Sequence, residues 1–206
     1  MTSRFDQQID RLVAADAVLA AVVSEHGRPV PFDRPPTFDT LVLLILEQQV
    51  SLDSARAAYN RLAAATEVAP QQMLDLTDDE LRTVGFSRQK SRYVRGLSER
   101  VADGRLDISR LAGLSDDDVR RELTSVPGIG PWTADVFLMS GLGRPDIWPI
   151  GDRALQVATR EALDLAEVPT PEALSQIGER WRPYRTAAAH ILWHGYLGRR
   201  NRAIPR

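Results

Sequence analysis

Apolar residues recur three or four positions apart along most of this chain, which is the spacing of one face of an α-helix. Within Phe5–Val23, for example, the apolar positions close to this spacing are Leu12, Val13, Leu19, Val22 and Val23. We found no convincing run of alternating polar and apolar residues that would predict strands. The chain is therefore expected to be all-α.

The length of 206 residues suits one large domain or two small helical lobes that share a cleft. A proline-rich connector over residues 28–36 separates the first helical segment from the second. We expect one lobe at about residues 38–150, with a hairpin at 123–135. Residues 1–37 and 151–206 would form the other lobe, and the active cleft would lie between the two.

A weak internal repeat organises the middle of the chain. The segment 76–82 (LTDDELR) recurs 38 residues later as 114–120 (LSDDDVR). Each copy predicts a helix that starts with a Thr or Ser cap and has acidic residues in its first turn, where they complement the helix dipole. A glycine-containing turn and another helix follow each copy. Two helix–turn–helix units are therefore expected.

Composition excludes several classes of site. The chain has no cysteine, so disulfides, an iron–sulfur cluster, thiolate zinc sites and a cysteine nucleophile are excluded. The most apolar run, Leu41–Leu46, is far too short to span a bilayer. No basic-then-apolar leader is visible, so a soluble cytoplasmic protein is expected. No phosphate-loop, dinucleotide or metal motif supports a small-molecule enzyme.

Charge is unevenly distributed although the net charge is only −2. From residue 180 to the end there are seven arginines and no acidic residue: Arg180, Arg182, Arg185, Arg199, Arg200, Arg202 and Arg206. Such a segment suits a phosphate backbone, but a solvated basic terminus is the commoner explanation.

The segment Leu123–Ala134 (LTSVPGIGPWTA) is the most informative stretch. Gly128 and Gly130 permit positive φ and leave no Cβ in the way of a phosphate. Pro131 suits the first position of a helix, where its missing N–H is not needed. Backbone amides at such a helix N-terminus form a site for an anion such as a DNA phosphate. An ordinary tight turn between packed helices is the alternative.

This segment resembles the hairpin of the helix–hairpin–helix (HhH-GPD) base-excision DNA glycosylase superfamily. The resemblance covers Phe38–Trp193 and is strongest to the bacterial 3-methyladenine DNA glycosylase II branch. It implies a monomer that binds double-stranded DNA through Pro127, Gly128, Ile129 and Gly130. It also implies that no cofactor is required, and that the carbonyls of Thr124, Val126 and Ile129 can hold a structural Na⁺ or K⁺.

Asp152 is the candidate catalytic residue. It follows a Pro-Ile-Gly turn and precedes a predicted helix, so helix capping alone would explain it. It also lies twenty residues after Trp132, the interval at which the family places its essential aspartate. The two roles are compatible. Cleavage of an N-glycosidic bond builds positive charge on the sugar, which a fixed carboxylate stabilises.

The position of the only lysine argues against a strand-cleaving enzyme. Relatives that cleave the strand use a lysine in the hairpin helix, and that position is occupied here by Trp132. The one lysine, Lys90, lies in the first helix–turn–helix unit. We therefore expect a monofunctional hydrolase. Charged alkylpurines are good leaving groups, and no second carboxylate is evident near Asp152, which favours alkylated bases as substrates.

A glycosylase extrudes its target nucleotide and holds the base in a pocket. Trp132 and Trp193 match pocket-wall aromatics of the family, although both could simply be core residues. Gln49 corresponds to the wedge that fills the gap left by the flipped base, and Ser51 is expected to cap the next helix. His190 and His194 are expected to pack rather than to bind a metal.

Two other functions remain open at this stage. One is a glycosylase for oxidised, mismatched or deaminated bases. The other is a helix–hairpin–helix module that binds DNA without catalysis, which would explain the hairpin and the arginines but not Asp152 at its interval.

Overall fold

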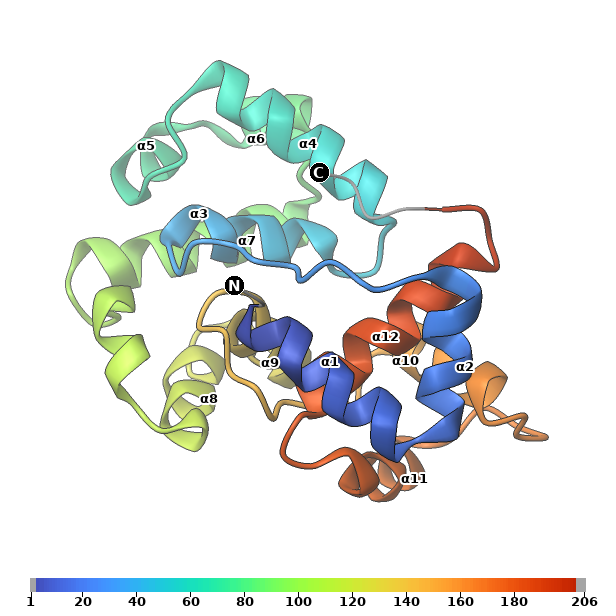
Figure 1. Cartoon of the computed structure of the whole chain (residues 1–206). Coiled ribbons are helices and arrows are strands. Elements are labelled where there is room, and N and C mark those ends of the chain that lie inside the picture. The colour runs from blue at the N-terminus through green and yellow to red at the C-terminus, as the bar shows by residue number, and fades with distance from the viewer. Residues whose placement is uncertain (1–2, 203–206) are drawn as a thin grey trace. The chain divides into compact units, whose positions relative to one another are not determined.

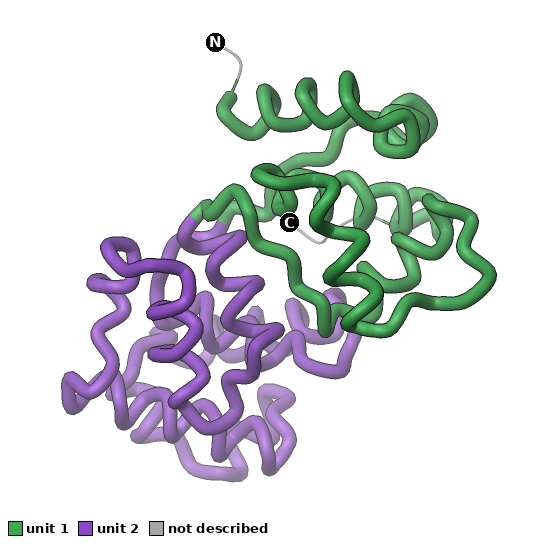
Figure 2. The backbone as a smooth tube through the Cα atoms, turned by 90° about the horizontal axis from the view of Figure 1, so that it is seen from below, with its two compact units in different colours: residues 1–33, 143–204 green, residues 34–142, 205–206 purple. Residues whose placement is uncertain are grey.

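The computed structural model describes residues 3–202 and contains helices and turns, with no strand among those residues. The fold is all-α, as the apolar spacing predicts. Of the described helices, none is both long and apolar enough to cross a bilayer. The chain divides into two compact units (Figure 2). One comprises residues 3–33 and 143–202, which we call the terminal unit; the other, the hairpin unit, comprises residues 34–142.

These bounds differ from those expected from the sequence. Residues 143–150 belong to the terminal unit, and residues 34–37 belong to the hairpin unit. Contacts explain both shifts. The Ile147 amide donates to Thr186 Oγ1 (3.1 Å), and the Arg34 amide donates to the carbonyl of Ser140 (2.9 Å).

The hairpin unit is built around one apolar helix, α3 (Figure 1). All of its residues except Asp39 are buried, as expected of a helix that is apolar on all sides. It packs against α4, α7 and α9. The helices of this unit are α3 (Phe38–Glu47), α4 (Leu52–Ala65), α5 (Pro70–Asp75), α6 (Asp78–Val84), α7 (Arg88–Ala102), η1 (Ile108–Gly113), α8 (Asp116–Thr124) and α9 (Pro131–Ser140).

The two repeat copies form α6–turn–α7 and α8–turn–α9, as predicted. Thr77 caps α6 and Ser115 caps α8, each through a side-chain oxygen that accepts an N–H three residues on. Ser51 caps α4 in the same way, since its hydroxyl accepts from the Ser54 amide (3.2 Å). All three caps follow from local sequence.

The terminal unit packs α1, α2 and α10 against α12 (Figure 1). Its helices are α1 (Arg4–Ala15), α2 (Ala17–His26), α10 (Arg153–Ala162), α11 (Pro171–Gly178), η2 (Glu179–Trp181) and α12 (Arg185–Gly198). The segment over Phe5–Val23 is not one helix, because α1 ends and α2 begins at Asp16. The Asp16 carboxylate accepts the amides of Val18 and Leu19, and also Trp181 Nε1 (2.9 Å).

Candidate DNA interface and catalytic carboxylate

The turn between α8 and α9 is anchored by its apolar residues. Val126 and Ile129 are buried, and the Ile129 amide donates to the Val126 carbonyl (3.0 Å). Gly128 between them has φ +92°, a conformation that L side chains rarely adopt. This backbone conformation therefore favours glycine at position 128.

The space beside Gly128 is filled by the protein itself. A Cβ on Gly128 would lie 2.1 Å from Cγ of Tyr93, whose side chain comes from α7. The missing Cβ of Gly128 thus makes room for the Tyr93 ring, and a contact between this glycine and a DNA phosphate stays a prediction. A Cβ on Gly130 would meet nothing within 4 Å. Gly130 is exposed, so its approach is open on the protein side.

Helix α9 begins without a side-chain cap. Its N-cap residue is Gly130, whose position carries no side-chain hydrogen bond, and Pro131 is the first helical residue. The first amides of a helix have no partner within the helix, and the helix dipole makes this end partially positive. A helix end of this kind suits an anion, and the phosphate site at the hairpin stays a prediction.

Gln48 joins the end of α3 to the hairpin. Its side-chain amide donates to the carbonyl of Gly128 (2.8 Å) and to Oγ1 of Thr133 (3.1 Å). Gln48 is the C-cap of α3, and the next residue, Gln49, is exposed with φ +59°. The candidate wedge therefore lies beside a residue that is bonded to the hairpin.

Asp152 lies at the N-terminus of α10 in the terminal unit. Its amide donates to the carbonyl of Pro149 (2.9 Å), which closes the Pro-Ile-Gly turn. Its Oδ1 accepts the Leu155 amide (2.6 Å), so the capping role expected from the sequence is confirmed. Leu155 is fully buried, and Asp152 is half-buried. The carboxylate is thus held by the backbone of a helix whose first turn is packed in the core.

Trp193 on α12 makes a second bond to this carboxylate. Its indole Nε1–H donates to Asp152 Oδ1 (3.1 Å). Sequence reasoning had named both residues but did not place them in contact. The Trp193 ring is half-buried and packs edge-on against Phe32 and His190, with centroids 5.8 and 5.7 Å apart.

His190 is a buried, uncharged packing residue, as expected. Its Nε2 accepts the amide of Phe32 (3.2 Å), so its Nδ1 carries the proton and donates to the Thr186 carbonyl (2.8 Å). Burial lowers the pKa of His190 to about 4. His194 Nε2 lies 2.8 Å from the carbonyl of His26. Both rings therefore support α12 from within the terminal unit.

The four tryptophans divide into two kinds. Trp148 and Trp181 are buried, and each donates its indole N–H within the terminal unit, to the Leu174 carbonyl and to Asp16. Trp132 and Trp193 are half-buried. The two candidates for a base pocket are therefore the two that keep part of their surface accessible.

The similarity to a known family extends well beyond the hairpin. A family profile described as "HhH-GPD superfamily base excision DNA repair protein" matches residues 42–183. The chain belongs to the HhH-GPD superfamily.

Individual members of the HhH-GPD superfamily are similar over most of this chain. The Bacillus subtilis protein YfjP, which carries the provisional name DNA-3-methyladenine glycosylase, is 31% identical over 185 residues, and the match covers 85% of this chain. The chain spans 64% of the length of that relative.

Two solved structures of such enzymes have the same fold. The 3-methyladenine DNA glycosylase of Schizosaccharomyces pombe, in complex with abasic DNA, is 26% identical with a TM-score of 0.81, covering 91% of this chain and 95% of that one. The DNA-3-methyladenine glycosidase of Bacillus halodurans is 35% identical with a TM-score of 0.74, covering 94% and 89%.

The cation expected in an HhH-GPD hairpin would depend on backbone oxygens. Among residues 3–202 there is no group of three or more His, Cys, Asp or Glu side chains able to hold a metal. The carbonyls of Thr124, Val126 and Ile129 belong to one short turn. That of Val126 already accepts the Ile129 amide but has a second lone pair. These oxygens fit a hard monovalent cation, and the site stays a prediction.

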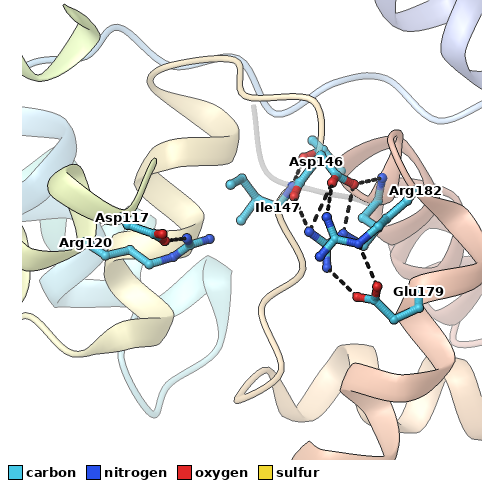
Figure 3. A network of polar contacts seen from close by, with 8 residues as sticks. Asp117, Arg120, Asp146, Ile147, Glu179 and Arg182 are labelled. Atoms are coloured by element: carbon cyan, nitrogen blue, oxygen red, sulfur yellow. Dashed lines mark hydrogen bonds and ion pairs between the residues drawn. The ribbon is translucent and has the colours of Figure 1, made fainter. Parts of the chain in front are cut away.

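The arginines of the last segment bind acidic side chains of their own unit. Arg182 and Arg185 bind Asp146 at 2.9 and 2.8 Å, and both also bind Glu179 (Figure 3). Arg180 pairs with Asp16, and Arg199 and Arg200 pair with Glu161. Hydrogen bonds from Arg200 and Arg199 lower the pKa of Glu161 to about 2.

These pairs revise the two explanations offered for the basic segment. Five of its arginines form ion pairs with acidic residues of the terminal unit, which neither a phosphate-binding tail nor a solvated terminus would require. Arg206 lies outside the described residues. The arrangement accounts for the arginines by intramolecular ion pairs.

Proposed function

We propose that this protein is a monofunctional DNA glycosylase that hydrolyses the N-glycosidic bond of alkylated bases such as 3-methyladenine. The observation that carries the proposal is the Asp152 carboxylate, held by the Leu155 amide and the Trp193 indole in a chain that also has the family's hairpin. Three relatives named for this activity support the choice of substrate.

In this mechanism Asp152 stabilises positive charge on the sugar as the bond to the base breaks. Water adds its hydroxyl to C1′ and releases a proton, and the bonding electrons leave with the base. A base alkylated at a ring nitrogen is cationic and departs as a neutral molecule, so it needs no strong acid. A preorganised charged group of this kind contributes on the order of 10²–10³ in rate.

The aromatic residues give the site a preference for charged bases. Trp193 contacts the carboxylate through its ring edge, so one candidate pocket wall lies directly beside Asp152. Trp132 is the other candidate. An aromatic face attracts a cationic base by about 0.5–2 kcal/mol, depending on how dry the site is.

The hairpin supplies DNA binding without base specificity. The uncapped start of α9 would take a phosphate oxygen of double-stranded DNA, and a Na⁺ or K⁺ on the carbonyls of Thr124, Val126 and Ile129 would add a second contact. Neither contact reads sequence, which suits an enzyme that must act wherever a lesion occurs. We expect the enzyme to act as a monomer, and in a bacterial-type cell to act in the cytoplasm, where the chromosome lies.

The contacts of Lys90 are consistent with a hydrolase that does not cleave the strand. Its ammonium group donates to the carbonyls of Leu46 (2.7 Å) and Gln48 (2.9 Å). An amine engaged in this way is poorly placed to attack a sugar carbon. Reduction with borohydride during turnover should therefore trap no protein–DNA adduct.

A base-release panel tests the proposal. Purified protein is incubated with duplexes that carry methylated purines, uracil, 8-oxoguanine or a mismatch, and free bases are separated by chromatography. We expect release of 3-methyladenine at the highest rate and little from the other duplexes. Release mainly of oxidised, deaminated or mismatched bases would identify a different glycosylase. Tight binding to every duplex with no release would identify a DNA-binding module.

A further inference from the structure

The loop between α3 and α4 holds an unfavourable backbone conformation at an exposed position. Gln49 has φ +59° without being glycine, and it is exposed. Val50 beside it is an exposed large apolar residue, 47% accessible. Such a conformation persists only where the surrounding structure holds it in place.

One side chain holds the residues that precede this tip. Lys90 reaches from the first turn of α7 and donates to the carbonyls of Leu46 and Gln48, at 2.7 and 2.9 Å. These oxygens lie at the C-terminal end of α3, which carries partial negative charge. The Gln48 carbonyl belongs to the peptide bond that leads into Gln49. Lys90 therefore fixes the orientation of the peptide bond between Gln48 and Gln49, and so supports the left-handed backbone conformation of Gln49.

The same helix also supports the hairpin. Tyr93, three residues after Lys90, packs against Gly128, and the side chain of Gln48 donates to the Gly128 carbonyl. Lys90 and Tyr93, which lie about one helical turn apart on α7, thus contact the loop and the hairpin within the same unit. Lys90 is the side chain that binds the backbone at the end of α3 and the start of the loop.

The choice of lysine at this position is itself informative. The sequence has 26 basic residues, of which Lys90 is the only lysine, so the other 25 are arginines. A compact ammonium can donate to two converging carbonyls, whereas the planar guanidinium fork suits carboxylates and phosphates. The carboxylates of Glu47 and Asp146 are bound by arginine, and the carbonyls of Leu46 and Gln48 are bound by lysine.

We propose that Lys90 is a positioning residue that holds Gln49 and Val50 in place to fill the gap left in the duplex when the damaged nucleotide is extruded. This inference rests on the proposed glycosylase function. Lys90 does not touch the base or the sugar in this account. It keeps Gln49 and Val50 rigid, so that their insertion into the duplex offsets part of the stacking and pairing energy lost on extrusion.

The proposal predicts a dependence on how firmly the lesion is paired. Extrusion is most costly for a paired base and least costly for a mismatched or unpaired one. Loss of Lys90 removes both of its hydrogen bonds and should therefore slow release from a fully paired lesion by at least about tenfold, since one charged hydrogen bond alone has an effect of that size. It should change release from a bulged lesion less than about twofold.

The experiment compares Lys90→Met with Arg92→Met. Arg92 is an exposed residue on the same helix, so both variants lose one positive charge from α7. Single-turnover release of 3-methyladenine is measured from paired and bulged duplexes. The expected result is a paired-to-bulged rate ratio that falls at least about tenfold for Lys90→Met and stays constant for Arg92→Met. Equal losses on both duplexes by Lys90→Met would overturn the proposal.

Chemical rescue separates positioning from general damage to the fold. The chain has no cysteine, so Lys90→Cys introduces a unique thiol. Alkylation with 2-bromoethylamine restores an ammonium at the same distance from the backbone, and alkylation with iodoacetamide adds a neutral group. The first product should regain the ratio of the unmodified protein, and the second should not. Equal behaviour of the two products would contradict the role of the charge.

A flipping measurement keeps this test independent of catalysis. Fluorescence of 2-aminopurine rises when the base leaves the stack, and no base release is needed to observe it. Lys90→Met should lower the fluorescence gain on a paired duplex but not on a bulged one. If the unmodified protein releases no alkylated base, the proposed function fails, while this measurement still decides the role of Lys90. An unchanged gain on the paired duplex would reject that role.

Discussion

Helices α9 and α10 begin in nearly the same way and present opposite charges. Each is a ten-residue helix that follows a Pro-Ile-Gly or Pro-Gly-Ile-Gly turn. The N-cap of α9 is Gly130, which has no side-chain cap bond. The N-cap of α10 is Asp152, whose carboxylate accepts the Leu155 amide. One helix start remains partially positive, and the other carries a fixed negative charge.

The difference shows how one local device can serve two chemical tasks. An uncapped helix start suits an anion such as a phosphate. A start capped by aspartate holds a carboxylate rigidly, where it can stabilise a developing cation. A glycosylase needs both. Under the proposed function the hairpin unit supplies the first and the terminal unit supplies the second, so substitutions should affect binding and chemistry separately.

The largest effect is expected from Asp152→Asn. Asparagine caps helices about as well as aspartate, so the fold of α10 should be kept. Removal of the negative charge should slow release of 3-methyladenine by on the order of 10²–10³-fold. Affinity for a lesion-containing duplex, measured by fluorescence anisotropy, should change by less than about twofold, since a single substitution away from the binding contacts has little effect. A rate within a factor of three of the original would remove Asp152 from the mechanism.

Gly128→Ala should disrupt the other helix start. The alanine would have to adopt φ +92°, and its Cβ would lie 2.1 Å from Cγ of Tyr93. Strain and overpacking together should lower the free energy of unfolding by about 2–3 kcal/mol, measured by urea denaturation.

Gly130→Ala is the matched control for Gly128→Ala, because its Cβ would meet nothing within 4 Å. Its loss should not exceed about 1 kcal/mol, the difference between glycine and alanine at an N-cap. Similar losses for the two variants would show that Tyr93 does not constrain the hairpin.

The sequence predicted the parts of this comparison that depend on neighbouring residues. The caps at Ser51, Thr77, Ser115 and Asp152 each join residues three apart, so a short window contains both partners. The turn glycines and the proline at the start of α9 are likewise local signals.

The sequence did not predict the contacts that connect distant residues. Trp193 and Asp152 are 41 residues apart, and Gln48 and Gly128 are 80 apart. Periodicity and capping rules do not determine which distant side chains meet, because tertiary packing decides it. The break at Asp16 combines both kinds of contact, since its carboxylate caps α2 locally through Val18 and Leu19 and also binds Trp181 Nε1, 165 residues away.

Gly130→Asp should make the two helix starts alike. The position has open space and a backbone conformation that aspartate adopts as an N-cap. The new carboxylate should stabilise α9 by about 0.5–1 kcal/mol and weaken duplex binding by about tenfold, because it occupies and neutralises the start of the helix.

Gly130→Asn controls for the charge in this experiment. It offers the same capping oxygen without a negative charge, so the expected loss of affinity is about twofold to threefold. Anisotropy at two salt concentrations measures both variants. If Gly130→Asp binds as tightly as the unmodified protein, the start of α9 is not where the phosphate binds.

A smaller effect on the release rate is expected from Trp193→Phe, which leaves the negative charge at α10 in place but removes the indole donor to Asp152. The Leu155 amide still holds Oδ1, so the release rate should fall only about fivefold, or about 1 kcal/mol. Phenylalanine keeps an aromatic face, so the substrate concentration at half-maximal rate should hardly change. Single-turnover titration separates the two quantities. If the half-maximal concentration changes and the release rate does not, Trp193 acts on the base alone. The start of α10 would then hold the Asp152 carboxylate without help from α12.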